Sequence, residues 1–344
     1  MTDLPAARLD VEALTTYLSE HAPDLGRVSA AEQLKGGQSN PTFRLTTSTG
    51  DLVLRMRPVG VGKWAHAVDR EFRVLAALAG TDVPVPRVHH FCGDESVLGG
   101  TFYVMDHVAG RVVDDARLPG FAPNERRAVY ESFVDTVAAL HAVDPVAIGL
   151  GDFGKPEDYA RRQVALHARQ YAATADPALP DMVWLAEHLP GLLGPNRLTR
   201  LVHGDVRIGN VMLHPSEPRV LALLDWEMST LGDPFADAAL LTISFHSPAN
   251  PQGHFDAAEA AALGIPSEAE LVERYVRAAG NGKFADYDVL MAFNLFRYAS
   301  THHGIHVRGL QGLGVNGDGP AYALTPAPLA ARARALVEPL LPAC

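Results

Sequence analysis

Cysteine is scarce in this sequence. Of its 344 residues only Cys92 and Cys344 are cysteines, and they lie far apart in the chain. Two distant cysteines can form neither a disulfide framework nor a cysteine-based metal knuckle, so small secreted disulfide scaffolds are excluded. This usage is typical of the reducing cytoplasm, and we expect a cytoplasmic protein.

The sequence also has few positively charged residues and no long apolar runs. The 29 Lys and Arg residues are outnumbered by 40 Asp and Glu residues, which gives a formal net charge of -11. Such a protein has no overall positive field to attract nucleic acid or an anionic membrane. No segment approaches the ~18 consecutive apolar residues that a membrane helix needs, and the opening MTDLPAARLD lacks the apolar core of a signal peptide. We therefore expect no nucleic-acid partner and no membrane partner, and the oligomeric state stays open.

The residues that are present predict a small β-rich lobe at the start of the chain. A helix is expected at 11–21, and short β-like runs around turn residues follow between Gln33 and Arg57. A second helix is expected at 67–78, and the segments VPVPRVHHFC and TFYVMDHVAG add two strands bounded by proline and glycine. We assign residues 1–104 to this lobe and 105–110 to a hinge.

The remainder of the chain, residues 111–344, predicts a larger and mostly helical lobe, so the fold class is α+β with two lobes. One segment between the helices has a β-like pattern and predicts a polar loop between short apolar strands. Its sequence is LVHGDVRIGNVMLHPSEPRVLALLDWE. Apolar residues at helical spacing predict helices at 123–141, 159–173, 181–188, 268–279 and 286–307.

The polar loop carries the most informative residues. Asp205 and Asn210 lie five residues apart in HGDVRIGN, and Asp225 ends a buried-looking strand in LLDWE. Phosphoryl transfer needs an Asp that receives or orients the acceptor's proton, and an Asn and a second Asp that hold Mg²⁺ against the nucleotide phosphates. An HGD sequence alone is weak, since Asp-rich loops often only cap helices or form Asx turns. The full spaced set favours a kinase.

These segments resemble the aminoglycoside phosphotransferase and choline kinase-like branch of the protein kinase-like fold, and especially the kinase domain of acyl-CoA dehydrogenase family members 10 and 11. The resemblance covers nearly the whole chain and implies a phosphotransferase that uses ATP, with GTP not excluded, and Mg²⁺. It rests on GGQSN, LVLRMRP, AHAVDREFRVLAAL, TFYVMDHVAGR, HGDVRIGNVMLHP, LLDWEMSTLGDP with Asp237, and FRYASTHHGIHVRGLQG.

The resemblance assigns roles in the reaction to four residues. Asp205 resembles the catalytic base, and Asn210 and Asp225 resemble the metal ligands. Arg207 stands two residues after the base, where protein kinases often carry a lysine near the transferring phosphoryl group, so it is expected to stabilise charge.

Further residues are expected to bind the nucleotide. In the resembled family the glycine turn is the nucleotide loop, which makes Gly37, Gln38, Ser39 and Asn40 candidates for phosphate contact. Taken alone the turn is equally compatible with a plain hairpin, and Pro41 removes one amide donor from it.

Arg55 occupies the place of the phosphate-binding cation on the third strand, as an arginine does in choline kinase-like members, and Glu71 on the next helix is its natural partner. The alternative is an exposed strand arginine and an ordinary surface glutamate. Met105 and His107 lie in the hinge, where adenine is usually held by backbone hydrogen bonds.

The acceptor is less well defined than the nucleotide. The resemblance implies a small hydroxylated molecule such as a hydroxyacyl-CoA or hydroxy acid, and the basic or neutral stretch from Arg297 to Arg308 suits an anionic acceptor. An aminoglycoside-type antibiotic kinase, a kinase-like module that binds nucleotide without transfer, and a metal-dependent phosphohydrolase remain alternatives. His302, His303 and His306 could place two imidazoles on one helical face, but no carboxylate accompanies them in sequence, so a metal site there is disfavoured.

Overall fold

A computed structural model describes residues 9–34, 40–57, 68–248, 250–280, 282–311, 322–323 and 325–341. The chain forms two compact units. The first consists of Met1–Ala109 and Ala222–Glu227, and the second of Gly110–Leu221 and Met228–Cys344. The division into 1–104, 105–110 and 111–344 stays a prediction; the segment Ala222–Glu227, which it assigned to the second lobe, is grouped with the first unit.

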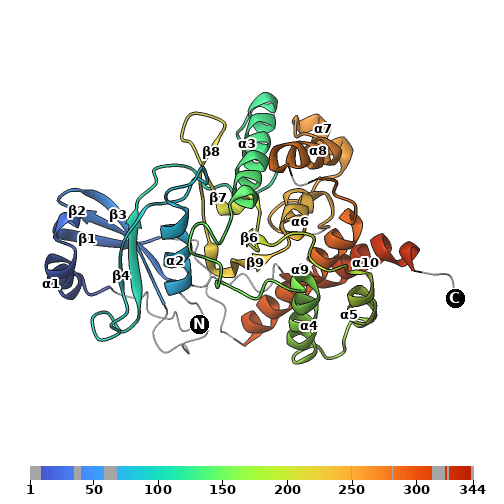
Figure 1. The fold of residues 1–344 in the computed structure, drawn as a ribbon, viewed down its shortest axis with the longest axis horizontal. Helices are drawn as coiled ribbons and strands as arrows, with labels where there is room; N and C mark the ends of the chain where they lie inside the picture. Colours follow the sequence, from blue (N-terminus) through green and yellow to red (C-terminus); the bar gives the residue numbers. More distant parts are fainter. Residues whose placement is uncertain are drawn as a thin grey trace. The chain divides into compact units, whose positions relative to one another are not determined.

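The first unit is built on a five-stranded antiparallel sheet in the order β1-β2-β3-β5-β4 (Figure 1). Its strands β2 and β3 are joined by a tight turn, so that Thr47 pairs with Gly50. The strands are β1 (Val28–Gln33), β2 (Thr42–Thr47), β3 (Gly50–Met56), β4 (Val88–Cys92) and β5 (Phe102–Asp106).

Helices α1 (Val11–His21) and α2 (Val68–Leu78) pack against the sheet of the first unit. Leu14 and Leu18 of α1 join a buried cluster that contains Phe102 and Val104 of β5. Tyr103 lies between these two residues on the strand and contacts Phe72 of α2 instead, with ring centroids 6.2 Å apart. Because successive strand residues point to opposite faces, the two helices use opposite faces of β5.

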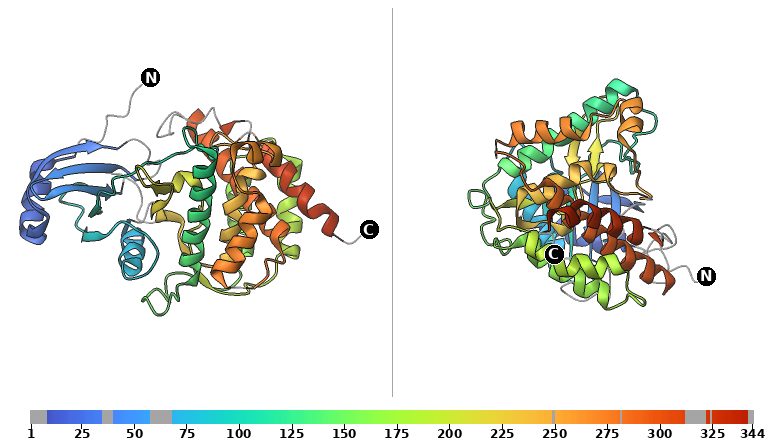
Figure 2. Two further views of the ribbon diagram at one scale, coloured as in Figure 1. Left: turned by 90° about the horizontal axis from the view of Figure 1, so that it is seen from above. Right: turned by 90° about the vertical axis from the view of Figure 1, so that its right-hand side faces the viewer.

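The second unit is mainly helical, and α9 (Tyr287–Leu310) runs through it between α4 and α10 (Figures 1 and 2). Its residues from Val289 to Ser300 are all buried, including the polar Asn294, Arg297 and Ser300. The other helices are α3 (Pro123–Ala142), α4 (Tyr159–Ala172), α5 (Pro180–Leu192), α6 (Pro234–Ala238), α7 (Ala257–Leu263), α8 (Glu268–Ala279) and α10 (Pro326–Val337).

Short strands in the second half of the chain carry the polar loop. β6 (Arg200–Val202) pairs with β9 (Thr230–Gly232), and β7 (Val211–Leu213) pairs with β8 (Val220–Leu223). The expectation of a polar loop between short apolar strands is therefore confirmed, as is the α+β class. None of the helices in the described parts of the chain combines the length and apolar character that crossing a bilayer requires.

Candidate functional site

The loop after β6 is held in place by a buried aspartate, Asp237 of α6. One carboxylate oxygen, Oδ2, accepts hydrogen bonds from the backbone N–H of His203 at 2.7 Å and from His141 Nε2 at 3.1 Å. The other, Oδ1, accepts from the backbone N–H of Gly204 at 2.8 Å. Burial opposes ionisation of Asp237, but His141, His203 and this hydrogen bonding outweigh it and lower the pKa of the carboxyl.

Gly204 allows the loop to turn tightly beside Asp205. Its φ of 84° lies in the left-handed region, and a Cβ atom there would meet the backbone oxygen of Met228 at 2.7 Å. The carbonyl oxygen of Gly204 accepts a hydrogen bond from Arg297 Nη2 at 2.9 Å. Asp237 and Arg297 therefore fix the backbone of this loop through its N–H and C=O groups respectively.

The carboxylate of Asp205 accepts hydrogen bonds on both of its oxygens. Oδ2 receives Asn210 Nδ2 at 2.8 Å and Arg207 Nε at 3.2 Å, and Oδ1 receives the hydroxyl of Tyr298 at 3.2 Å. Burial alone would raise the pKa of Asp205, but the charge of Arg207, His203 and the hydrogen bond from Asn210 lower it. The carboxyl of Asp205 is therefore ionised at neutral pH.

A pocket of the second unit lies beside this carboxylate. Arg207 Nη1 lies 3.8 Å from Asp114 Oδ1, and the side chain of Asp114 is 78% exposed. Among the described lining residues Asp114 is the only carboxylate and Arg207 the only cation, so the wall is nearly neutral. The lining residues are Asp114, Ala116, Arg207, Ile208, Gly209, Ile243, Ser244, Asn250, Gln252 and Tyr298.

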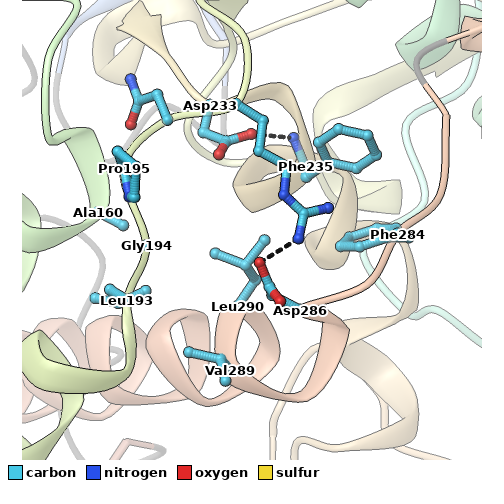
Figure 3. Close-up of a pocket in the computed structure, with 12 residues that line it drawn as sticks. Ala160, Leu193, Gly194, Pro195, Asp233, Phe235, Phe284, Asp286, Val289 and Leu290 are labelled. Atoms are coloured by element: carbon cyan, nitrogen blue, oxygen red, sulfur yellow. Dashed lines mark hydrogen bonds and ion pairs between the residues drawn. The ribbon is translucent and has the colours of Figure 1, made fainter.

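A second pocket of the same unit is shown in Figure 3, and its charged side chains serve packing. Arg197 pairs with Asp286 and lies over the ring of Phe235, with its guanidinium carbon 5.9 Å from the ring centroid. Asp233 caps α6 by accepting a hydrogen bond from the backbone N–H of Phe235 at 2.9 Å. Asp233 therefore has a structural role at the start of α6, the helix that carries Asp237.

In the first unit, Arg55 is bonded to two carboxylates. Its Nε lies 2.8 Å from Glu71 Oε2, and its Nη2 lies 2.6 Å from Asp225 Oδ1. Glu71 also accepts hydrogen bonds from the hydroxyl of Tyr103 at 3.0 Å and from Asn40 Nδ2 at 2.8 Å. Burial raises the pKa of Glu71, and Arg55 acts against that shift. The structure therefore pairs Arg55 with the glutamate expected from the sequence.

The other residues expected at the nucleotide site come from the glycine turn and from the region around β5. Gly37, Gln38 and Ser39 lie outside the described residues. The side chain of Asn40 is fully buried and donates to Glu71, and a phosphate contact through the backbone of Asn40 stays a prediction. Met105 is half-buried in β5, where it pairs with Val53, and His107 follows just beyond the strand.

The residues expected to hold Mg²⁺ have suitable donor atoms. Asn210 directs Nδ2 at both the backbone oxygen and Oδ2 of Asp205, each at 2.8 Å, which leaves its amide oxygen as the ligating atom. Asp225 offers a carboxylate that is 35% exposed. Oxygen donors of this kind fit Mg²⁺, which also takes ligands from phosphates and water.

His302 and His303 each form a hydrogen bond with a threonine side chain. His302 Nδ1 is 3.0 Å from Thr325 Oγ1, and His303 Nε2 is 3.2 Å from Thr174 Oγ1. Within the part of the chain that the structure describes, no group of three or more His, Cys, Asp and Glu residues could hold a metal ion.

Sequence reasoning did not find the contacts made by Tyr298 and His141. Tyr298 and Asp205 are 93 positions apart in the sequence, and His141 and Asp237 are 96 positions apart. No local motif indicates contacts between residues so far apart. His141 is fully buried. Asp237 was identified from the sequence only through the family resemblance.

Comparisons with known proteins give a consistent family. Residues 30–293 match the model of the phosphotransferase enzyme family, APH. The chain is 37% identical over 338 residues to acyl-CoA dehydrogenase family member 11 of Rattus norvegicus, a match that covers 95% of this chain and 43% of that protein. The chain therefore spans less than half the length of this relative.

Solved structures show the same fold. A candidate aminoglycoside phosphotransferase from Ralstonia eutropha has a TM-score of 0.85 and 40% identity, over 96% of this chain and 99% of that one. The GDP complex of aminoglycoside 2'-phosphotransferase-IIIa has a TM-score of 0.62 and 15% identity, over 95% and 99% of the two chains, and shows the fold alone.

Proposed function

Because the chain belongs to the phosphotransferase enzyme family, we propose that it is a small-molecule kinase that transfers the γ-phosphoryl group of ATP to a hydroxyl group. The observation that carries the proposal is Asp205, an ionised carboxylate on a loop fixed by Asp237 and Arg297, beside a pocket. A carboxylate in this setting can accept the proton of an acceptor hydroxyl.

The proposal gives each polar residue one role. Asp205 orients the acceptor and receives its proton, and Arg207 stabilises negative charge near that carboxylate. Asn210 and Asp225 would hold Mg²⁺, which when bound neutralises charge on the nucleotide phosphates. Arg55, braced by Glu71, is assigned to the phosphates, and the backbone at Gly37, Gln38 and Ser39 and at Met105 and His107 to the rest of the nucleotide.

For the acceptor we propose a hydroxylated acyl compound, either a hydroxy acid or its CoA thioester. The nearly neutral pocket wall supports this, because a polycationic aminoglycoside is held best by several carboxylates and Asp114 is the only one among the described lining residues. The similarity to an acyl-CoA dehydrogenase family member is also consistent with an acyl group. An aminoglycoside-type kinase is the second candidate, since a candidate enzyme of that kind is 40% identical.

Thermal unfolding with nucleotide tests the nucleotide part without any acceptor. A ligand that binds only the folded protein adds RT ln(1 + [L]/Kd) of stability, about 2.7 kcal/mol at a concentration 100 times Kd. We expect a Mg²⁺-dependent rise in melting temperature with ATP or GTP, and a smaller rise in Asp225→Asn. No rise with either nucleotide at millimolar concentration would contradict the proposal and favour a kinase-like module without nucleotide chemistry.

A turnover screen tests the transfer. Hydroxyacyl-CoAs and free hydroxy acids are compared with kanamycin, and Asp205→Asn is expected to lower kcat by about 10²- to 10⁴-fold while keeping the nucleotide-dependent rise in melting temperature. Full activity of Asp205→Asn would contradict the proposal that Asp205 is the base. Faster turnover of kanamycin than of every hydroxyacyl compound would overturn the acceptor class.

A further inference from the structure

We propose that Tyr298 is a positioning residue whose hydroxyl fixes the rotation of the Asp205 carboxylate, so that Oδ1 is the oxygen that receives the acceptor's proton. The inference rests on the proposed function and deepens it. Its basis is the hydrogen bond of 3.2 Å from the Tyr298 hydroxyl to Oδ1.

The two oxygens of Asp205 differ in how much room they leave for an acceptor. A carboxylate oxygen has about two lone-pair sites for hydrogen bonding. Oδ2 already accepts from Asn210 and Arg207, so both of its sites are used. Oδ1 accepts from Tyr298 and, among the described residues, from no other group, which leaves one of its sites open. Because Tyr298 itself lines the neighbouring pocket, that open site is the one within reach of a molecule bound there.

Tyr298 is itself held firmly. One residue before it, Arg297 donates to the backbone oxygen of Gly204, and one turn before it, Asn294 Nδ2 donates to the backbone oxygen of Ala236 at 2.7 Å. One turn after it, the ring of His302 packs against Tyr298 with centroids 5.6 Å apart. These contacts fix α9 relative to the loop, so the phenol presents its hydroxyl to Asp205 in one orientation.

The phenol remains a donor throughout the usable pH range. Burial, together with the negative charge of Asp205, raises the pKa of Tyr298 well above its ordinary value. Tyr298 therefore cannot replace Asp205 as a base.

The transfer step balances with Tyr298 unchanged. The acceptor oxygen bonds to the γ-phosphorus while the bond from that phosphorus to the β,γ-bridging oxygen breaks, and ADP leaves with that electron pair. The acceptor's hydroxyl proton passes to Oδ1 of Asp205. If the carboxylate rotated freely, Oδ1 would point at the acceptor only part of the time. Fewer bound complexes would then be ready to react, so loss of the Tyr298 hydroxyl should lower kcat.

The variant Tyr298→Phe keeps the ring and removes the hydroxyl. We expect kcat to fall about 10- to 100-fold, with the acceptor KM changed by less than about threefold and the nucleotide-dependent rise in melting temperature unchanged. The acid limb of the kcat profile should move to higher pH, because a carboxylate that loses a donated hydrogen bond is protonated more readily. A kcat and pH profile equal to those of the wild type would overturn the proposal.

Tyr287→Phe is the matched control on the same helix. Tyr287 donates to Glu268 and pairs with Thr242, so its loss removes hydrogen bonds of the same kind away from Asp205. It should lower the melting temperature and leave kcat and the pH profile as they are. If both variants lower kcat equally, Tyr298 acts only through stability and the proposal fails.

A second measurement separates this inference from the proposed function. Infrared difference spectroscopy follows protonation of the Asp205 carboxyl without turnover, and Asp205→Asn identifies its band. A higher pKa of Asp205 in Tyr298→Phe supports the contact even if no acceptor is turned over, and an unchanged pKa overturns it. Absence of turnover in the wild type with every acceptor counts against the proposed function alone.

Discussion

At the scale of single residues, buried charges of the first unit depend on one another. The side chains of Arg55 and Glu71 are 11% and 2% exposed, so each has lost most of its water. Burial works against the charge of Arg55, yet Glu71 and Asp225 raise its pKa above the ordinary value. The pair is stable because Asn40 and Tyr103 satisfy the oxygens of Glu71 as well.

Replacing Arg55 should therefore destabilise the protein strongly. Arg55→Met leaves the Glu71 carboxylate buried without its cation, and we expect the free energy of unfolding to fall by about 3 to 5 kcal/mol. Urea unfolding at pH 7 measures this.

The double variant Arg55→Met, Glu71→Leu provides the control. It should recover much of the loss, because neither member of the pair is then charged. A single variant that loses less than about 1 kcal/mol would contradict the dependence of Glu71 on Arg55.

At the scale of elements, the sequence predicted the helices that carry a clear apolar period. The expected bounds of α1 and α8 agree with the structure residue for residue. The helix α7 was not predicted, because its seven residues, AAEAAAL, are too few to establish a period. The helix α10 begins at Pro326 in a segment rich in Pro and Ala, whose small and rigid residues obscure an apolar period.

The candidate site was predictable where its residues share a local loop. Asp205, Asn210 and Arg207 lie within six positions, and the structure joins them by hydrogen bonds. The side chains that hold them come from α6 and α9, and these contacts arise only when the helices pack. A single sequence carries the loop motif but does not record which helix faces it.

The cap of α8 gives a prediction at this scale. Ser267 Oγ accepts a hydrogen bond from the backbone N–H of Glu270 at 3.3 Å, and Glu270 Oε2 accepts from the backbone N–H of Ser267 at 2.8 Å. Ser267→Ala should lower the free energy of unfolding by about 1 kcal/mol. Ser216→Ala, at an exposed loop position, should change it by less than about 0.5 kcal/mol in the same urea titration. Equal effects of the two substitutions would contradict a capping role.

At the scale of the whole molecule, stability should fall in mild acid because two histidines are buried in neutral form. Burial, with Arg297 nearby, lowers the pKa of His167 to about 3. Burial lowers that of His302 to about 4, and Arg207 contributes. Below their ordinary value of 6.5 the unfolded chain binds protons that the folded protein does not, so stability rises with pH in this range and is lost as pH falls.

Each of these histidines should lower the free energy of unfolding by about 2 kcal/mol between pH 7 and pH 5. Guanidinium unfolding at the two pH values measures the loss. In His167→Gln the loss of stability between the two pH values should be smaller than in the wild type by about 2 kcal/mol. The same pH dependence in wild type and His167→Gln would rule out His167 as a source.

The division of the chain has a consequence for its synthesis. Residues Ala222–Glu227 belong to the first unit although more than a hundred residues of the second unit precede them. During translation, Arg55 can meet Glu71 early, but Asp225 leaves the ribosome only after most of the chain has been made. At about 5 to 20 residues per second, the first unit waits roughly 6 to 24 seconds for its last segment. A nascent chain halted before residue 222 therefore carries an N-terminal unit in which Arg55 lacks both Asp225 and Glu227, which pair with it in the folded protein.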